Sequence, residues 1–600
     1  MNRIVEVLPD VSGLDRSFAY EVPEALAGTV TLGCMVRVLL HGRRVRGWVV
    51  DEAEAPPPGI ELRPLIGLVS LGPQRDVVDL CRWASLRYAG RLRPLLVAAS
   101  PPRLVPALPA HGSPRASAPS PALSRSGLEA EIGTATVQAL GCSSAVLRLP
   151  PAAPRLAVVT AAIEATRGRG DLLVLAPSKN DASILASRLE RARHPVALQP
   201  EDWAAAASGG RVVVGTRSAV LSRLSGLSAI VVLDAHADSY QEQRVPTWEA
   251  TVLAEERARR AGVPCVLVSA CPSVEMVSGR RLFTLSRDSE RSGWAPIEVL
   301  DVREEDPRAR GYSARLAAVI RDAAREDPGR PVVAVLNRKG RARLLACGRC
   351  RGLLRCARCG AALVQLERAA PGETALLHCP RCLLDTPAQC ASCGPTRPVI
   401  VRPGVARARE DLAALTGLEV AEIARAGAGV APDAPVLIGT EAVLHRAAPA
   451  SVVVFLDFDN ELLAPRFRAG EQALALLALA SRLIGGRRRS GRVVVRTRVP
   501  DHEVLDAALH ADPGRLAAQE GPRRRQLRLP PETALALVSG DGAAEFASRL
   551  STVAGSLEVG STAPGRFLIR ATAPQLLAQA LADAGPPHHG TRIEVAPRQV

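Results

Sequence analysis

Short apolar runs alternate with polar and turn residues at the start of the chain. The segments "RIVEVLP", "CMVRVLL" and "RGWVVDE" show the alternation of half-buried strands, with turn-forming residues between them. Residues 1–100 are therefore predicted to form a mostly β N-terminal domain. The next stretch, which contains "SPPRLVPALPAHGSPRASAPSP", is rich in Pro, Ala and Ser and has almost no periodicity. We interpret residues 101–145 as a linker.

Beyond the linker, continuous apolar runs alternate with helical stretches in two successive series. Runs without a polar face are typical of parallel strands that are covered by helices on both sides. The pattern predicts two tandem parallel-sheet α/β lobes, followed by a small α/β domain over residues 501–600. The first lobe covers 146–325, with strands at 171–177, 211–216, 229–235 and 264–270. The second covers 326–345 and 395–500, with strands at 331–337, 398–404, 435–440, 451–459 and 491–497.

Composition and charge narrow the class of partner. The 600 residues exceed what one hydrophobic core organises, so several domains are expected. The net charge is +16 and arginine supplies almost all of the positive charge, which favours a polyanion such as nucleic acid. The N-terminus has no secretory h-region, and the longest apolar run, 473–480, is far short of a membrane span. We expect a cytoplasmic, nucleoid-associated protein with no membrane partner and with reduced thiols.

Eight cysteines form four Cys-x-x-Cys pairs within residues 346–394, as an insertion in the second lobe. Nineteen residues separate Cys359 from Cys379, which is a zinc-ribbon spacing, whereas only five separate Cys350 from Cys356. Four protein thiolates leave no open position on an ion, so both sites are expected to be structural. Iron–sulfur clusters or a redox disulfide are the alternatives. The predicted zinc ligands are Cys356, Cys359, Cys379 and Cys382 for one ion, and Cys347, Cys350, Cys390 and Cys393 for the other.

This cysteine pattern inside a second α/β lobe resembles the bacterial replication-restart family PriA (primosomal protein N′), which is a superfamily 2 helicase family. Shorter segments support the resemblance by their order along the chain. They are "GTRSAVL" (215–221), "DAHADSYQEQ" (234–243), "SACPSVE" (269–275), "LIGT" (437–440) and "QLRLPP" (526–531). The resemblance implies two RecA-like lobes, an inserted two-zinc ribbon, an N-terminal DNA-binding domain and a C-terminal domain. A winged helix normally follows the N-terminal domain, and here we expect it to be reduced or absent.

The departures from the family all concern ATP. A phosphate loop needs glycines and a Lys-Ser/Thr pair, but the corresponding segment reads "LRLPPAAPRLAVV" and the chain has no Gly-Lys dipeptide. Ala235 stands where such motors carry the glutamate that activates water, after Asp234. Ungapped alignment places Leu483 and Gly486 at the family's arginine positions. We therefore expect no catalytic residue and no bound ATP or Mg²⁺, with Asp234 as a strand-end residue and His236 as a packed or solvated histidine.

The resemblance also suggests DNA contacts in the N-terminal domain, which in the family recognises the 3′ end of the leading strand. Phe18 matches the aromatic residue that lies against the terminal base, Gly42 matches a glycine that allows close backbone approach, and Arg63 matches a basic contact. Ala19 replaces the neighbouring aspartate. The alternative roles are ordinary ones: Phe18 in the core, Gly42 in a turn and Arg63 as a solvated charge.

Three functional hypotheses follow. The first is a replication-restart protein that binds stalled or abandoned forks and helps to reassemble the primosome without unwinding DNA. Its partners are then forked DNA, single-stranded DNA and 3′ ends, together with single-stranded-DNA-binding protein and primosome or helicase-loading proteins. The second is an ATP-dependent 3′–5′ DNA helicase with an unusual nucleotide site, since the family consists of such enzymes. The third is a zinc-ribbon protein that binds another nucleic acid, such as RNA.

Overall fold

The structure is a computed structural model of the 600-residue chain. It describes residues 3–53, 61–109, 127–304, 312–337, 345–350, 352–365, 376–379, 381–382, 384–400, 405–423, 433–447, 449–553 and 557–598. No helix in these ranges is long and apolar enough to cross a membrane.

The N-terminal domain is an antiparallel sheet with two helices packed on one face. Val36 and Val38 point into a core on one face of the sheet, whereas Met35 and Trp48 point to the opposite face, beneath the helices. The strand order is β2 (Phe18–Glu21), β1 (Ile4–Pro9), β4 (Arg43–Ala53), β3 (Met35–Leu40) and β5 (Gly67–Ser70), and the helices are α1 (Arg75–Arg87) and α2 (Leu92–Ala99). The predicted β character of this domain is confirmed.

Lobe 1 is a seven-stranded parallel sheet with a hydrophobic core on each face. Its strand order is β12 (Arg281–Phe283), β6 (Ser144–Arg148), β11 (Cys265–Ser269), β10 (Leu227–Val232), β7 (Asp171–Leu175), β9 (Val212–Gly215) and β8 (Val196–Leu198). The main helices are α3 (Gly127–Leu140), α4 (Arg155–Ala165), α5 (Lys179–Arg191) and α7 (Ala250–Ala261).

Lobe 2 is a six-stranded parallel sheet of the same type. Its strand order is β13 (Ile297–Asp301), β25 (Arg492–Thr497), β24 (Val452–Phe455), β14 (Val332–Val335), β23 (Val436–Gly439) and β22 (Val420–Glu422). Its helices include α10 (Ala314–Glu326), α11 (Val405–Thr416), α12 (Ala442–Arg446), α13 (Asp459–Leu462), α14 (Ala469–Ile484), α15 (Glu503–Leu509) and α16 (Pro513–Leu527).

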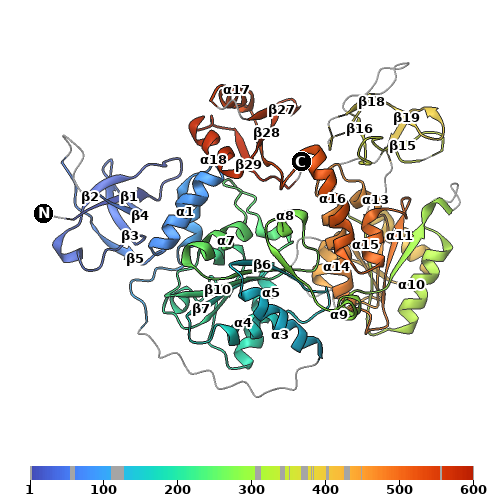
Figure 1. Cartoon of the computed structure of the whole chain (residues 1–600), viewed down its shortest axis with the longest axis horizontal. Coiled ribbons are helices and arrows are strands. Elements are labelled where there is room, and N and C mark those ends of the chain that lie inside the picture. Colours follow the sequence, from blue (N-terminus) through green and yellow to red (C-terminus); the bar gives the residue numbers. More distant parts are fainter. Residues whose placement is uncertain are drawn as a thin grey trace.

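The cysteine-bearing insertion consists of short two- and three-stranded pieces. They are β15 (Leu345–Cys347) with β21 (Pro398–Ile400), then β16 (Val364–Gln365), β17 (Leu376–His378) and β18 (Asp385–Pro387), and finally β19 (Gln389–Cys390) with β20 (Gly394–Pro395). Figure 1 places the insertion at the end of the molecule opposite the N-terminal sheet.

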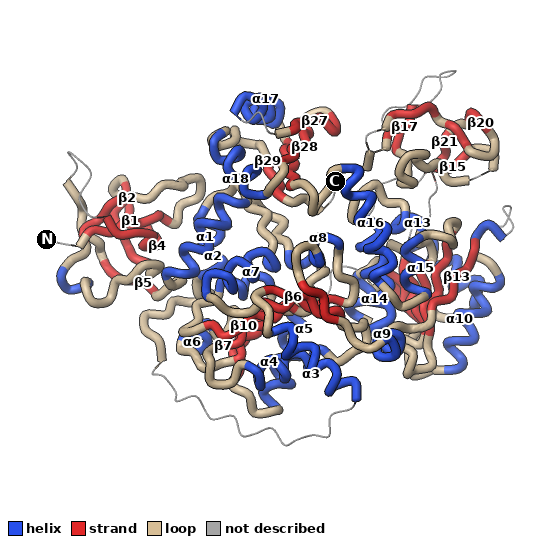
Figure 2. Tube along the Cα trace, viewed as in Figure 1, coloured by secondary structure: helices blue, strands red, loops and turns tan. Residues whose placement is uncertain are grey.

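The C-terminal domain lies between these two ends, above the lobes, as the coloured tube in Figure 2 also shows. Its β-α-β-β-α-β order forms an antiparallel sheet with both helices on one face. The sheet order is β27 (Glu558–Ala563), β28 (Arg566–Ala571), β26 (Ala534–Ser539) and β29 (Arg592–Val595), with helices α17 (Ala543–Val553) and α18 (Pro574–Asp583). Helix α18 packs on α1, so the C-terminal domain contacts the N-terminal one.

The predicted fold class is confirmed, but several elements lie elsewhere than predicted. Segment 398–404 was expected in the sheet of lobe 2, whereas β21 pairs with β15 of the insertion. Strand β13 belongs to the sheet of lobe 2, although it lies inside the range predicted for lobe 1. Helix α3 falls within the range predicted to be a linker. It belongs to lobe 1 instead, because Ile132 and Ala139 on it are buried in the core of that lobe. Residues 110–126 of that linker, and 401–404 of the expected strand, lie outside the described residues.

Candidate functional sites

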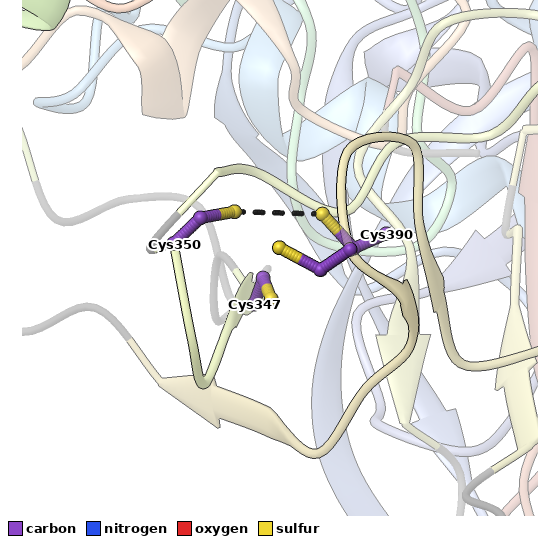
Figure 3. A group of neighbouring side chains, drawn as sticks. Cys347, Cys350 and Cys390 are labelled. Atoms are coloured by element: carbon purple, nitrogen blue, oxygen red, sulfur yellow. Dashed lines mark hydrogen bonds between the residues drawn. The ribbon is translucent and has the colours of Figure 1, made fainter.

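The eight cysteines of the insertion gather into two groups of four. One group is Cys347, Cys350, Cys390 and Cys393, and the other is Cys356, Cys359, Cys379 and Cys382. Within each group all sulfur atoms lie within 4.8 Å of one another. Figure 3 shows Cys350 and Cys390 pointing toward each other beside Cys347. The structure thus brings together the same two sets that the spacing predicted.

The sulfur geometry fits a tetrahedral ion of zinc size. The Sγ–Sγ distance is 3.5 Å for Cys350 and Cys390 and also 3.5 Å for Cys356 and Cys382. A Zn–S bond of about 2.3 Å implies ligand sulfurs about 3.8 Å apart, which is close to these values. Four soft sulfur donors without an oxygen ligand favour zinc over magnesium or calcium. Both groups are therefore candidate metal sites of the closed, structural type.

The buried core of the insertion is small among the described residues. It combines the cysteines with a few apolar side chains, among them Leu345, Leu354 and Leu377. It is attached to lobe 2 by the hydrogen bond from the Ala362 amide to the Leu463 carbonyl, 2.9 Å long. The Arg381 guanidinium also forms a 3.1 Å ion pair with buried Glu520 on α16. Arg381 is therefore committed to an internal partner rather than to solvent.

The second site is the segment between β6 and α4, where a nucleotide-driven motor carries its phosphate loop. Three prolines in 149–154 have no N–H, and the other three amides already donate hydrogen bonds. The Leu149 amide donates to the Ser269 carbonyl at 3.0 Å, the Ala152 amide to the Gly293 carbonyl at 3.1 Å, and the Ala153 amide to the Pro150 carbonyl at 3.0 Å. No amide of this loop is left to bind phosphate.

Asp234, two residues after the end of β10, is held by two arginines from different lobes. Arg155, the first residue of α4 in lobe 1, donates through Nη1 to Asp234 Oδ2 at 2.5 Å. Arg482, near the end of α14 in lobe 2, donates through Nη1 to the same oxygen at 2.8 Å and through Nη2 to Oδ1 at 2.5 Å. Burial alone raises the pKa of the Asp234 carboxyl, but Arg482 and Arg155 outweigh it and hold that pKa well below its usual range. Both carboxylate oxygens are therefore occupied by guanidinium groups.

Sequence alignment missed Arg482 and Arg155. The ungapped alignment placed Leu483 at the arginine position, and the side chain that reaches Asp234 comes from the preceding residue. Arg482 also donates to the Pro151 carbonyl at 2.9 Å, and Gly486 packs against Ala152. The helical phase of α14, which sequence alone does not fix, decides which residue faces lobe 1.

His236 lies next to this ion cluster as a neutral side chain. Its Nδ1 is 2.9 Å from the Ser269 hydroxyl, in the "SACPSVE" segment. Burial lowers the pKa of His236 to about 4, against a smaller opposing effect of Asp234. This agrees with the packed histidine that was one of the two expected roles.

A second group of ion pairs also crosses between the lobes. Glu275, on the short helix α8 (Val274–Val277) of lobe 1, pairs with Arg468 at 2.7 Å and with Arg524 at 3.2 Å. Arg524, on α16, is fully buried and also pairs with Glu471 of α14 at 2.6 Å. Glu471 in turn accepts a 2.8 Å hydrogen bond from the Val274 amide. Arg524 thus joins a carboxylate of lobe 1 to a carboxylate of lobe 2, and Arg468 pairs across the lobes with Glu275 alone.

The predicted DNA contacts lie around the core of the N-terminal sheet. Phe18 is half-buried on β2, and the Arg16 guanidinium lies 4.7 Å from its ring centroid. Gly42 has a positive φ of 77° at the exposed turn between β3 and β4, and the space where a Cβ would stand is open to 4 Å. Arg63 is exposed, and its carbonyl accepts from the Glu21 amide at 3.0 Å. Ala19 pairs with Glu6 across β1 and β2.

Comparison with known proteins decides the family. Residues 6–101 match the family described as the 3′DNA-binding domain (3′BD) of PriA. A probable replication restart protein PriA of Mycobacterium leprae is 30% identical over 88% of this chain and 86% of its own length. This chain belongs to the PriA family.

Other PriA relatives align over similar lengths. The probable replication restart protein PriA of Mycobacterium tuberculosis (strain ATCC 25618 / H37Rv) is 29% identical over 88% of this chain and 85% of its own length. The replication restart protein PriA of Treponema pallidum is 27% identical over 88% of this chain and 85% of its own length. The similarity to PriA proteins therefore spans both lobes as well as the N-terminal domain.

Proposed function

We propose that this PriA-family protein binds stalled or abandoned replication forks and helps to reassemble the replication machinery without hydrolysing ATP. The observation that carries the proposal is the paired state of Asp234 between Arg155 and Arg482. Family membership supports the restart role, because the relatives are described as replication restart proteins. Recruitment of single-stranded-DNA-binding protein and helicase-loading proteins belongs to the proposal on that same ground.

The DNA-binding part of the proposal rests on the N-terminal domain. Its match to a 3′DNA-binding domain supports recognition of a strand end. Phe18 offers a ring on which any terminal base can stack, and the exposed Gly42 turn leaves space for a close backbone approach. Arg63 and Arg16 supply positive charge for phosphate. Ala19 has no polar group with which to select a free 3′ hydroxyl.

The absence of ATP hydrolysis is supported by what the cleft residues already bind. A γ-phosphate and its magnesium need free backbone amides, a lysine and an unengaged carboxylate. Here the amides of 149–154 bond to carbonyls, and Asp234 is shared by two guanidinium groups. Loss of one arginine finger alone lowers turnover by roughly 10³–10⁵. Loss of the phosphate loop and of the activating glutamate together removes the means of catalysis.

The same ion pairs support a scaffold rather than a motor. A helicase opens and closes its lobes in each cycle, with nucleotide as the bridge between them. In this chain Arg482 bridges the lobes through Asp234, and Arg468 bridges them through Glu275. Removing one partner of a buried ion pair costs about 3–5 kcal/mol, because the other charge stays buried without compensation. The lobes are thus held together by side chains without any nucleotide.

Zinc is expected to contribute stability and not chemistry. The two cysteine groups would each hold one Zn²⁺ with no open coordination position, so the ion supplies folding free energy to the insertion. The cysteines would orient the knuckles, and Arg381 with Glu520 would dock the folded insertion on α16.

Two measurements on the full chain test the proposed function. Affinity is measured for forks whose leading-strand 3′ end is free or phosphate-blocked, over a salt series, and ATP turnover is measured with and without the same forks. We expect strongly salt-dependent fork binding and no stimulated turnover. The D234N variant controls for contaminating ATPase, because any trace that persists in it does not come from this cleft.

Each adverse result removes a stated part of the proposal. Robust fork-stimulated turnover that D234N abolishes, while D234N still binds the forks, would replace the scaffold by an ATP-dependent helicase. Equal affinity for free and blocked ends would remove the assignment of Phe18, Gly42 and Arg63 to a 3′-end pocket. Tighter binding of structured RNA than of forks would favour a different nucleic acid as the partner.

A further inference from the structure

The hairpin formed by β3 and β4 carries three exposed arginines on one face. Arg37 lies on β3, and Arg44 and Arg46 lie on β4. All three are exposed, and none forms an ion pair with the part of the chain that the structure describes. We call these three residues the arginine strip.

The strip continues a face of the sheet that is otherwise buried. Met35 and Trp48 pair across the two strands and lie under α1 and α2, where Trp48 is only 1% exposed. One step along the same face, Arg37 lies directly opposite Arg46. Because side chains alternate between faces, Val38 and Val45 point the other way, into the core. The face changes from apolar to cationic where helix cover ends.

The hairpin extends beyond its neighbouring strands. The pairing of β4 with β1 ends with the hydrogen bond from the Asp10 amide to the Arg46 carbonyl, 2.7 Å long. The pairing of β3 with β5 ends at Arg37. Residues 38–45 therefore form a two-stranded ribbon with no third strand beside it among the described residues.

The positive charge of the strip is not compensated locally. Like charges directly opposite each other on two strands destabilise a sheet, yet Arg37 and Arg46 occupy such a position. Asp10, whose amide bonds to the Arg46 carbonyl, pairs its carboxylate with Arg93, and farther along β4 Asp51 pairs with Arg82 and Glu52 with Arg3. An uncompensated cationic face of this kind attracts a polyanion.

We infer that the arginine strip binds the phosphate backbone of the duplex that leads up to the recognised 3′ end. This inference rests on the proposed fork-binding function and adds a second contact to it. Residues two apart on a strand, such as Arg44 and Arg46, are about 6.6 Å apart, which is close to two 3.4 Å rises along the axis of a DNA duplex. At a fork the nucleotides before a nascent 3′ end are base-paired, so the phosphates that reach the strip belong to a duplex. Gly42, at the tip of the same hairpin, connects the strip to the predicted 3′-end contact.

The test compares R44Q/R46Q with a charge-matched control, R315Q/R407Q, in the full chain. Arg315 and Arg407 are 63% and 75% exposed on lobe 2, where they pair with Glu298 and Asp411. Affinity is measured on forks with and without a nascent leading strand, from about 0.05 to 0.2 M salt. On the fork with the leading strand, R44Q/R46Q is expected to bind about tenfold or more weakly, with a salt slope reduced by about 2.

Three results would overturn the inferred duplex contact of the arginine strip. They are equal weakening by the control double variant, an unchanged salt slope, or the same loss of affinity on the fork that lacks the leading strand. Thermal unfolding checks the fold independently, because removal of like charges should not lower the midpoint. If the unmodified protein binds neither fork, both the proposed function and the inferred role of the arginine strip are refuted. If the unmodified protein and R44Q/R46Q bind forks equally well, only the inferred role of the strip is refuted.

Discussion

The cysteine insertion and the cleft between the lobes differ in whether their polar groups are paired with one another. In the insertion, two groups of four sulfur atoms converge within 4.8 Å and leave room for an ion. In the cleft, the groups that would face a nucleotide bind one another, with Asp234 between Arg155 and Arg482. Donors that converge on one point can hold a ligand there, whereas buried polar groups that pair with one another are already satisfied internally.

The insertion and the two lobes also differ in what stabilises them. The insertion has a small core, and its two groups of four cysteines could hold metal ions that would supply folding free energy. The lobes have large cores, and their contact is reinforced by partly buried ion pairs such as Arg482 with Asp234.

Replacing Cys379 by Ser should release one of two zinc ions and unfold part of the insertion. The reason is that zinc binding contributes about 10–16 kcal/mol of apparent free energy in small zinc modules. Zinc per chain, measured by elemental analysis, should fall from two to one, while amide exchange rises in the insertion. The matched control is C142S, outside both groups, which should keep both ions. Retention of two ions by C379S would refute the assigned pairing.

The D234N variant should destabilise the frame by about 3–5 kcal/mol, because it leaves the Arg155 and Arg482 guanidinium groups without their buried anion. The free energy of unfolding in urea is the measurement. The control is E558Q, which breaks an exposed pair with Arg528 and should cost about 0–1 kcal/mol. Adding R482Q to D234N should recover part of the loss. Equal effects of D234N and E558Q would contradict the assigned bridge.

Stability should fall as pH drops from 6.5 toward 4, in part through His236. The folded pKa of His236 is lowered from 6.5 to about 4, so the unfolded chain binds more protons in that window. The contribution is complete above pH 6.5 and is lost as pH falls through the folded pKa, with a slope of at most about 1.4 kcal/mol per pH unit.

Urea unfolding between pH 7 and pH 4 measures this slope. The H236Q variant should have a shallower dependence on pH than the parent protein. H588Q changes an exposed histidine and should leave the slope unchanged. Parallel curves for H236Q and the parent would rule out the neutral, packed state of His236.

Restoring a glutamate next to Asp234 should change ATP turnover least of all. In A235E the carboxylate of Asp234 remains paired and the amides of 149–154 remain bonded to carbonyls. Turnover by A235E should therefore equal that of the isosteric A235Q, with and without forked DNA. A gain confined to A235E would show that the cleft still admits nucleotide.

The fold class, the two sets of cysteines and the lack of a phosphate-loop motif can all be predicted from the amino-acid sequence alone. These features are local: a continuous apolar run specifies a buried parallel strand, Cys-x-x-Cys spacing specifies a knuckle, and proline removes a backbone donor wherever it stands. The roles of residues such as Cys359 and Pro150 can thus be predicted from the residues next to them in the sequence. The family resemblance rested on the same local signals.

Only the tertiary structure decided what fills the cleft and where edge elements pair. Arg155 and Arg482 are far apart in sequence, and their contact with Asp234 depends on the phase of two helices and on the docking of two lobes. Segment 398–404 reads as a core strand, but β21 pairs with β15 because long-range partners set strand pairing. The arginine strip likewise depends on where α1 and α2 stop covering the sheet. Periodicity shows which side chains share a face, and packing decides whether that face meets protein or solvent.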